Sequence, residues 1–370
     1  MLRIAFIIVV ALHGLIHLMG FARGFGYADL PQLAQPISRT TGALWLVAAA
    51  LLVAAAATFA VAVLPRWWWL LGALALVASQ CAIVSSWGDA KLGTVANLIL
   101  LVAVLYGFAS RGPLSLRAQY ERRLHDNAPA APAAAVLTEA DLAPLPEPVQ
   151  RYVRGTGVLG RPRPRSFRAT WRGRIRSSAT SPWMSFTAEQ LNTLEPPQRF
   201  FKMDAVMKGL PVDVLHVYDQ SGATMRVKLL SVFPMADVKG PDLTRAETVT
   251  LFNDLCILAP GALISPLITW QPIDASTARA RFTLGANAIG AELHFDAAGQ
   301  LVSFVSDDRS AGSPDGATLT RMRWATPLSK YEQIGPARVA TRGDAVWYPA
   351  TGAYAYGEFE LMSLGYDLQP

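Results

Sequence analysis

The first 110 residues consist almost entirely of four uncharged apolar stretches. The charge-free intervals hold 19, 26, 22 and 19 residues. A helix that crosses a hydrocarbon core of about 30 Å needs roughly 20 apolar residues. Each interval can therefore span a membrane once, and we expect a polytopic membrane protein with 370 − 110 = 260 further residues. The intervals run between Arg3 and Arg23, Arg39 and Arg66, Arg66 and Asp89, and Lys91 and Arg111.

The first stretch is expected to stay in the protein as a helix. It ends in the segment Phe21–Gly26, has no A-x-A-like cleavage site, and is followed by three more apolar stretches. Between the second and third stretches, Pro65-Arg66 precedes three tryptophans, Trp67 to Trp69. Proline ends helices and tryptophan favours the headgroup region, so this segment predicts a short turn at the membrane surface.

Basic residues predict the orientation of the four spans. Cytoplasmic loops of membrane proteins carry an excess of Lys and Arg. One side collects six basic residues and the other three, so we expect both termini in the cytoplasm and a multi-pass protein of the bacterial inner membrane. The six are Arg3, Arg66, Arg111, Arg117, Arg122 and Arg123, and the three are Arg23, Arg39 and Lys91.

Two histidines, His13 and His17, stand four residues apart in the first stretch and share one helix face. Such a pair can hold a metal ion or a haem. The other stretches supply no carboxylate and no third histidine, which favours neutral imidazoles hydrogen-bonded to neighbouring helices. We therefore predict no metal and no cofactor, with a metal or redox site as an alternative. The polar groups of the other stretches are Ser79, Gln80, Cys81, Ser85, Ser86 and Asn97.

The charge of the remaining residues argues against nucleic acid as a partner. After residue 110 there are 33 − 5 = 28 basic and 27 − 2 = 25 acidic residues, and the excess lies in 111–165, with 9 Arg against 5 acids. A basic segment beside the spans fits an anionic membrane surface. Cys81 and Cys256 are the only cysteines, which excludes a disulfide framework and a cysteine-based zinc cluster.

The sequence predicts three domains: a four-helix transmembrane domain over 1–110, a juxtamembrane helix and linker over 111–160, and a β domain over 161–370. The linker, 126–148, is rich in alanine and proline, including Pro129 and Pro132, which is typical of semi-stiff connectors. A short helix is expected at Pro148–Arg154, before Gly155.

From Ser166 onward, apolar residues recur with a period of two. Phe167, Ala169 and Trp171 fall on one face of the first strand and arginines on the other. This pattern predicts ten or eleven strands in a large antiparallel sheet joined mostly by hairpins. The further strands are expected at 199–208, 212–218, 225–233, 277–284, 291–296, 301–305, 319–324, 338–347 and 354–364.

One long helix interrupts the strands. Thr244 and Glu247 have the spacing of a capping box, and the helix is expected to run to about Leu258. Its apolar stripe needs a partner, and the concave face of the sheet is the available one. The predicted fold class is α+β: an N-terminal four-helix transmembrane bundle and a C-terminal curved antiparallel half-barrel covered by a helix.

Several segments of the β domain resemble an uncharacterised family of bacterial membrane proteins whose C-terminal domain is a LolA/LolB-like half-barrel. The resemblance covers roughly residues 140–370. It implies the half-barrel fold and attaches no activity. The segments are Leu145–Tyr152, Asn253-Asp254 with Ala259-Pro260, Trp270–Asp274, Phe295-Asp296 with Gly299, and the closing strand through Tyr354–Phe359.

The sequence offers no enzyme motif in a supporting context. G-x-S-x-G, H-E-x-x-H and the P-loop are absent, and the G-x-G-x-x-G run at Gly155–Gly160 follows an expected helix where a dinucleotide site needs a strand. Asp307 to Arg309 is expected to be a strand end or an internal ion pair. Arg168, Arg172, Arg174 and Arg176, on the outer face of the first strand, are expected to pair with acids on neighbouring strands, with lipid phosphates as the alternative partner. We predict a protein without enzymatic activity.

The leading functional hypothesis is a membrane-anchored module that binds a lipid, an acyl chain or a lipoprotein segment between helix and sheet. One alternative is a structural or signalling protein whose sheet docks a protein partner. The other is the redox or metal protein that uses His13 and His17. The residues expected to line the apolar site are Trp171, Phe186, Phe201, Met203, Trp270 and Phe282.

Overall fold

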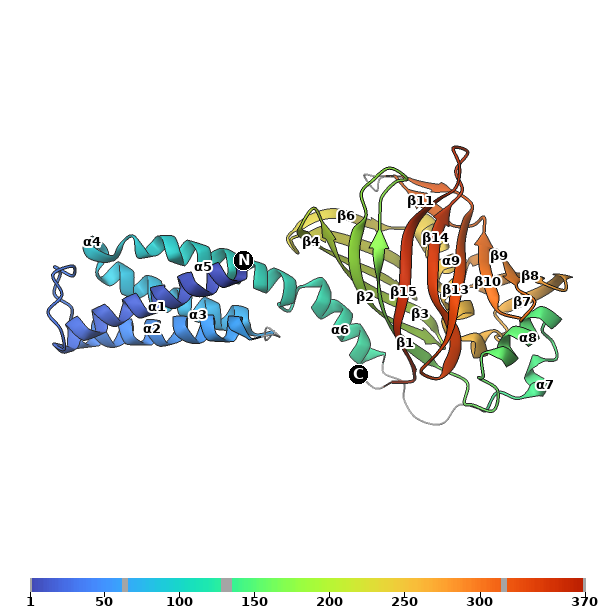
Figure 1. Cartoon of the computed structure of the whole chain (residues 1–370), viewed down its shortest axis with the longest axis horizontal. Helices are drawn as coiled ribbons and strands as arrows, with labels where there is room; N and C mark the ends of the chain where they lie inside the picture. The colour runs from blue at the N-terminus through green and yellow to red at the C-terminus, as the bar shows by residue number, and fades with distance from the viewer. Residues whose placement is uncertain (1, 62–65, 128–134, 314–317, 369–370) are drawn as a thin grey trace. The chain divides into compact units, whose positions relative to one another are not determined.

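The structure is a computed structural model that describes residues 2–61, 66–127, 135–313 and 318–368 (Figure 1). It divides into two compact units, Met1–Gln119 and Tyr120–Pro370. Pro65 of the predicted turn and Pro129 and Pro132 of the predicted linker lie outside the described residues.

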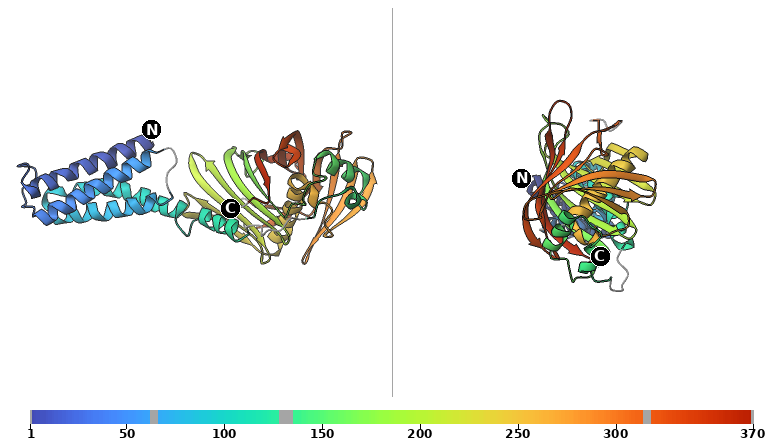
Figure 2. Two further views of the ribbon diagram at one scale, coloured as in Figure 1. Left: turned by 90° about the horizontal axis from the view of Figure 1, so that it is seen from below. Right: turned by 90° about the vertical axis from the view of Figure 1, so that its right-hand side faces the viewer.

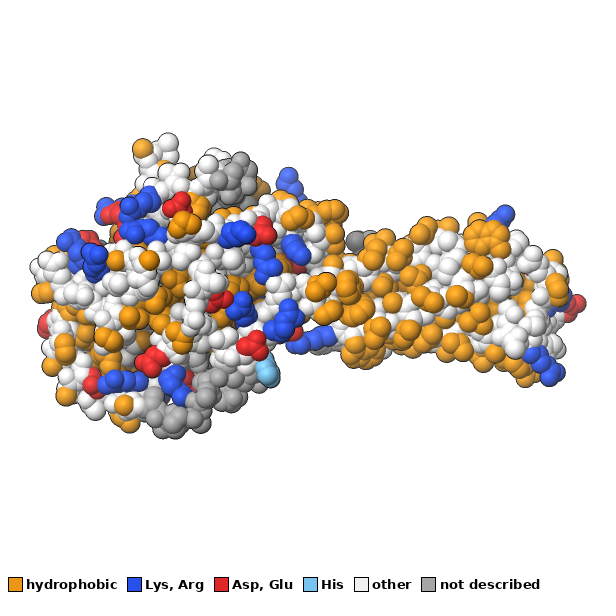
Figure 3. All heavy atoms as spheres, turned by 180° about the vertical axis from the view of Figure 1, so that it is seen from behind, with side chains coloured by type: hydrophobic (Ala, Val, Ile, Leu, Met, Phe, Trp, Pro, Cys, Tyr) orange, Lys and Arg blue, Asp and Glu red, His pale blue; other side chains and the backbone are white. Residues whose placement is uncertain are grey.

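The first unit is a bundle of four long helices with their apolar side chains facing outward. By length and composition each can cross a membrane, and at most 33% of the residues in each apolar window are buried. Figure 3 shows this surface covered with hydrophobic side chains, whereas charged groups are spread over the visible face of the sheet domain. The long helices are α1 (Leu2–Phe25), α2 (Arg39–Ala60), α3 (Trp68–Ser85) and α5 (Gly93–Arg111), with the short α4 (Trp87–Ala90) between the last two.

Small residues let these helices pack closely. Ala48 and Ala55 of α2 are completely buried. Gly20 of α1 packs directly against the indole ring of Trp45. A Cβ at this position would come within 2.1 Å of the ring, so only glycine fits there. This use of small residues at helix contacts is typical of membrane bundles, where no hydrophobic effect drives the helices together.

The second unit is dominated by one thirteen-stranded antiparallel sheet. Its strand order is β6-β5-β4-β3-β2-β1-β15-β14-β13-β10-β9-β8-β7, so β6 and β7 are its edges, and a small β11–β12 ribbon stands apart. The strands are β1 (Ser166–Ile175), β2 (Met184–Leu194), β3 (Pro197–Met207), β4 (Leu210–Asp219), β5 (Gly222–Leu229), β6 (Phe233–Lys239), β7 (Ile268–Asp274), β8 (Thr277–Leu284), β9 (Asn287–Phe295), β10 (Leu301–Ser306), β11 (Ser310–Gly312), β12 (Leu319–Arg321), β13 (Trp324–Ile334), β14 (Ala337–Trp347) and β15 (Tyr354–Tyr366).

The sheet curves around a single helix, α9 (Pro241–Leu258), as Figure 2 shows. Every residue of α9 from Ala246 to Leu258 is buried. The helix contacts strands on both sides of the curve, among them β3, β5, β9 and β14. Its apolar residues form the main core with the strands, for example through the stacked rings of Phe252 and Phe282, whose centroids are 5.0 Å apart.

Short helices precede the sheet. They are α6 (Leu116–Asp126), α7 (Glu139–Leu142) and α8 (Glu147–Gly155), and a 3₁₀ turn, η1 (Pro260–Ala262), follows α9. The Tyr152 hydroxyl of α8 donates to the Cys256 carbonyl of α9 at 2.8 Å, which attaches α8 to the core.

The predicted fold class is confirmed: long apolar helices are followed by a large open antiparallel sheet with a helix against its inner face. The capping box at Thr244 is wrong. The helix begins earlier, after Gly240, whose φ of 116° suits glycine, and Pro241 takes the first helical position. The Thr244 hydroxyl instead donates to the Gly240 carbonyl within the first turn.

The predicted strand count was too low. Strands β2, β7, β11 and β13 were missed, and the predicted strand 225–233 covers parts of both β5 and β6. Strand β2 escaped detection because two of its inward positions, Gln190 and Asn192, are polar and interrupt the apolar alternation.

Candidate functional site

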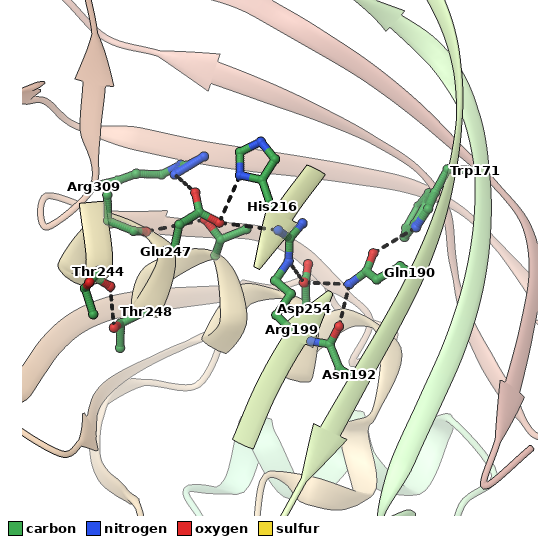
Figure 4. A network of polar contacts seen from close by, with 12 residues as sticks. Trp171, Gln190, Asn192, Arg199, His216, Thr244, Glu247, Thr248, Asp254 and Arg309 are labelled. Atoms are coloured by element: carbon green, nitrogen blue, oxygen red, sulfur yellow. Dashed lines mark hydrogen bonds and ion pairs between the residues drawn. The ribbon is translucent and has the colours of Figure 1, made fainter. Parts of the chain in front are cut away.

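A buried network of charged side chains lies between α9 and the inner face of the sheet (Figure 4). Arg199 of β3 is at its centre. Its Nε donates to Asp254 Oδ2 at 2.7 Å and its Nη1 to Glu247 Oε2 at 3.3 Å. The two acids are seven residues apart on α9 and so lie on one helix face. All three side chains are at most 11% exposed, so each charge depends on its partners.

Polar side chains of β2 extend the network along the sheet. Gln190 Nε2 donates to Asp254 Oδ2 at 2.7 Å and to Asn192 Oδ1 at 2.9 Å. The indole Nε1 of Trp171 in turn donates to Gln190 Oε1 at 2.9 Å. A continuous hydrogen-bonded chain therefore connects Trp171 of β1 with the acids of α9.

Glu247 has further basic neighbours at the other end of the network. Arg309 Nη1 lies 3.6 Å from Glu247 Oε1, and the guanidinium stacks 4.7 Å from the Trp324 ring centroid. Nδ1 of His216, on β4, is 3.8 Å from Glu247 Oε2. That His216 nitrogen and the Nε of Arg309 are buried without a hydrogen-bond partner among the described residues.

Burial and charge set the protonation of this network. Burial lowers the pKa of His216 to about 4, so its imidazole is neutral at pH 7. Burial by itself would raise the pKa of Glu247, but the neighbouring His216, Arg309 and Arg199 outweigh it and the net pKa is lowered. For Asp254 burial prevails over Arg199, and the pKa is raised. With both carboxylates ionised, two arginines balance two acids.

A separate apolar cluster covers another part of the concave face, and we call it the concave apolar cluster. It is distinct from the core around α9, and partly buried neighbours such as Ile175, Met207 and Leu229 pack against it. Its buried members come from β2, β3 and β4. They are Phe186, Ala188, Phe201, Met203, Ala205, Val212 and Val214.

The charged network borders this cluster. The Arg199 guanidinium lies 4.7 Å from the ring centroid of Phe201, and the His216 ring lies 6.2 Å from the same centroid. Trp171, which bonds Gln190, also packs against the cluster. The inner face of the sheet thus has an apolar zone on one side of the network and the α9 core on the other.

Exposed apolar side chains lie at two hairpin turns near the cluster. Leu210 starts β4 and is 43% exposed, and Phe233 starts β6 and is 57% exposed. The two turns are neighbours, because Pro211 accepts a backbone bond from Leu230 at 2.8 Å. Exposed apolar patches of this kind mark binding surfaces more often than scattered single residues do.

The six residues predicted to line an apolar site fall into two groups. Phe186, Phe201 and Met203 belong to the concave apolar cluster, and Trp171 packs against it. The other two lie elsewhere: Phe282 is completely buried in the α9 core, and Trp270 Nε1 donates to the Leu263 carbonyl at 3.1 Å.

The sequence analysis missed Arg199, Glu247 and Asp254 as a unit. Glu247 was assigned to a helix cap, although it lies in the second turn of α9 and is buried. The available signal was the seven-residue spacing of the two acids on a helix whose other positions are almost all apolar. Their basic partner lies 48 and 55 residues away in the chain, a pairing that no local pattern shows.

The two histidines of the first unit lie inside the helix bundle. His13 Nε2 is 3.1 Å from Ser79 Oγ and 3.2 Å from Asn97 Oδ1, and His17 Nε2 is 3.0 Å from the same Ser79 oxygen. The predicted hydrogen bonds to neighbouring helices are confirmed. A metal or haem role stays a prediction, which an absorbance spectrum and metal analysis of the purified protein test.

Two outer-face arginines of β1 pair with acids of β15 as predicted, whereas Arg176 donates to the backbone carbonyls of Ala355 and Ala179. On the outer face, Arg172 Nε donates to Glu360 at 2.8 Å and Arg174 Nε to Glu358 at 2.7 Å. Asp308 accepts from Arg245 Nη2 at 2.7 Å and from the Gly290 amide. These contacts are internal ion pairs and hydrogen bonds.

The sequence model of DUF6544, a family of unknown function, matches residues 135–359. The chain belongs to this family. That confirms the predicted membership in an uncharacterised family, and the match includes α8, the charged network and the concave apolar cluster. No curated protein matches the chain.

Three solved structures share part of the fold at low TM-scores. The first, an outer membrane lipoprotein-sorting protein domain from Vibrio parahaemolyticus, has a TM-score of 0.31 and 11% identity, covering 54% of this chain and 85% of that one. A DUF1329 family protein from Desulfovibrio piger has 0.28 and 10%, covering 56% and 88%. A LolA superfamily protein from Nitrosomonas europaea has 0.23 and 12%, covering 64% and 96%. Similarities this low carry no argument about function.

Proposed function

We propose that this protein is a membrane-anchored module that binds a lipid, an acyl chain or the lipid-bearing segment of a lipoprotein. The observation that supports this is the concave apolar cluster. It lies on the inner face of the sheet outside the core that α9 fills. The exposed Leu210 starts β4, one of its strands, and the exposed Phe233 pairs with Leu229, which packs against it. Curved antiparallel sheets bind single apolar ligands in this manner.

The charged network has a positioning role in this proposal. Arg199 holds α9 through Glu247 and Asp254 and thereby fixes the boundary between the core and the apolar cluster. Because its two arginines balance its two acids, it offers no net charge to a ligand. We therefore assign the cluster an uncharged acyl chain rather than an ionised group.

Anchoring and sidedness are part of the proposal. We place the four long helices of the first unit in the bacterial inner membrane, with both termini in the cytoplasm, and assign no enzymatic activity to the sheet domain. A cysteine introduced at Asn127, in a Cys81→Ser background, would be labelled by a membrane-impermeant maleimide only after lysis if the terminus is cytoplasmic. Labelling in intact cells would place the sheet domain on the other side.

The ligand proposal is tested with the full chain in lipid nanodiscs. A fluorescent fatty acid should bind the wild-type chain with a saturable signal above that of empty discs, and native mass spectrometry should detect a bound lipid. Ala188→Trp fills the cluster and should reduce binding at least tenfold, whereas Ala298→Trp in an exposed turn should leave it unchanged. Thermal unfolding checks that both variants fold. Equal binding by both variants would exclude the cluster as the site.

A second candidate function is docking of a protein partner on an edge of the sheet. The thirteen-stranded sheet is open, and β6 begins with the exposed Phe233 and carries Met235, which is 51% exposed. Edge strands accept additional strands from partners. A crosslinked protein at β6 in a chain that binds no lipid would favour this function over the first.

A further inference from the structure

The sheet domain contains a pocket of about 330 Å³. None of the residues that line it belongs to the concave apolar cluster. Five segments line it: the chain before α7, the loop between α8 and β1, η1, the β13–β14 turn and the end of β15. Backbone bonds hold the first two together, because Leu137 and Arg161 are joined at 2.9 Å and Gly160 donates to the Leu137 carbonyl at 2.9 Å.

The floor of the pocket is apolar and rigid. Leu137 and Val158 are 1% and 4% exposed. Pro162, Pro164 and Pro336 contribute to the walls, and proline restricts the backbone of the segments that carry it. The Tyr366 hydroxyl on the wall is already used, since it donates to the Leu258 carbonyl at 2.7 Å.

Two arginines, Arg161 and Arg163, line the pocket. Arg161 is exposed and forms no ion pair with any residue that the structure describes. Burial raises the pKa of the pocket residue Tyr366 well above its usual value while Arg161 opposes the rise, and both residues line the pocket. Arg163 is paired with Asp141 at 2.6 Å, yet its Nε is buried without an acceptor among the described residues.

The one carboxylate that lines the pocket is engaged by the protein itself. Asp367 Oδ1 accepts the backbone amides of Arg165 and Ser166 at 3.0 and 2.9 Å. With Arg163 paired to Asp141 and Asp367 held by backbone amides, Arg161 is the cation of the lining that forms no ion pair with a described residue. Guanidinium groups bind carboxylates and phosphates with two parallel hydrogen bonds, which suits an oxyanion.

We propose that this pocket binds a small anionic amphiphile, an apolar body on Leu137 and Val158 with a carboxylate or phosphate held by Arg161. A volume of 330 Å³ equals about eleven water molecules at roughly 30 Å³ each, which suits a compact ligand rather than a long acyl chain. Because the pocket and the concave apolar cluster share no residue, the two sites are separate, and this proposal does not depend on the proposed function.

The test uses the full chain in nanodiscs and isothermal titration with four probes, with empty discs as the blank. Benzoate and phenyl phosphate carry the two oxyanions on the same ring, benzamide is the neutral analogue, and inorganic phosphate lacks the apolar body. We expect one of the two aryl anions to bind at least tenfold more tightly than benzamide and inorganic phosphate. Which of the two anions binds more tightly shows whether the natural ligand carries a carboxylate or a phosphate.

Two variants and one control locate the site. Arg161→Ala should weaken binding of the preferred anion at least tenfold and leave benzamide unaffected. Gly261→Leu should abolish binding by filling the pocket, because a Cβ at Gly261 would lie 3.4 to 3.9 Å from Pro164, Leu137 and Val158. Arg154→Ala removes an exposed arginine that pairs with Glu139 outside the pocket and should bind like wild type. Affinities of both benzoate and phenyl phosphate no higher than that of benzamide, or unchanged binding of the preferred anion by Arg161→Ala, would overturn the proposal.

Discussion

The two units of this protein differ in whether they bury charge. Among the described residues of the helix bundle the buried polar groups are uncharged amides, hydroxyls and imidazoles, with Ser79 between His13, His17 and Asn97. The sheet domain buries ions as well as uncharged groups: Arg199 lies between Glu247 and Asp254. Both sets are almost completely removed from solvent.

The difference follows from what surrounds each network. If the helices cross a membrane as we propose, lipid around them supplies neither water nor counter-charge for a buried ion, and neutral hydrogen bonds cost less free energy there. Inside the sheet, α9 and β3 can bring opposite charges within 3.3 Å of one another. The ionic network is thus the more vulnerable of the two, because loss of one member leaves an uncompensated charge.

The largest expected effect is therefore the loss of Arg199. Arg199→Met leaves Glu247 and Asp254 buried without their main cation and should lower the free energy of unfolding of the sheet domain by about 3–5 kcal/mol. Urea denaturation followed by tryptophan fluorescence measures it.

A compensated variant separates charge from packing. Arg199→Met combined with Glu247→Gln and Asp254→Asn removes all three charges and should recover more than half of the loss. If Arg199→Met alone lowered the free energy by less than about 1 kcal/mol, the network would not matter for the fold as described.

The next effect is a dependence of stability on pH that belongs to His216. Its pKa is about 4 in the folded protein against 6.5 for an ordinary histidine, so the unfolded chain binds more protons between these values. The contribution of His216 to the free energy of unfolding should be complete above pH 6.5. It should decrease as the pH is lowered toward 4, by about 3 kcal/mol at most. His216→Gln should flatten this part of the profile, and an unchanged slope would refute the assignment.

The neutral network should respond more weakly. Ser79→Ala removes the hydroxyl that joins His13, His17 and Asn97 and should destabilise the helix bundle by about 1 kcal/mol, as single polar contacts in membrane bundles do. Thermal unfolding in detergent micelles measures it. Ser110→Ala is the matched control, because that hydroxyl donates to the carbonyls of Tyr106 and Gly107 on its own helix. A loss as large as that of Arg199→Met would contradict the comparison.

The smallest effect is expected on the outer face of the sheet. Arg279 and Glu292 form an ion pair at 2.6 Å, with side chains 53% and 31% exposed. Arg279→Met should change the free energy of unfolding by less than about 1 kcal/mol, because water and salt screen such pairs. The same urea titration as for Arg199→Met gives the direct comparison, and similar losses at both sites would show that burial does not distinguish them.

Much of the architecture could be predicted from periodicity alone. The long apolar helices, the clean alternation of β1 and the hairpin from Asp219 to Gly222 are local patterns, and the structure has all of them. Local patterns failed where a strand buries polar residues, as at Gln190 and Asn192 of β2. They also failed where the helix start is set by Gly240 and Pro241 rather than by a capping hydroxyl.

The candidate site was only partly accessible to such reasoning. Phe186, Phe201 and Met203 alternate on two strands, and they do share one cluster. Phe282 has the same alternation but faces α9, because the position of a strand within the sheet order decides which residues meet. The charged network needed a contact between Arg199 and a helix about 50 residues later, which only the folded chain supplies.

The central claim is that an apolar ligand lies on the concave apolar cluster. A photoactivatable fatty acid, irradiated with the full chain in nanodiscs and followed by peptide mass spectrometry, tests it most directly. We predict adducts on β2, β3 and β4, within Met184–Leu194, Pro197–Met207 and Leu210–Asp219, which an excess of unlabelled fatty acid abolishes. Adducts confined to the four long helices, with none on these strands, would contradict the account.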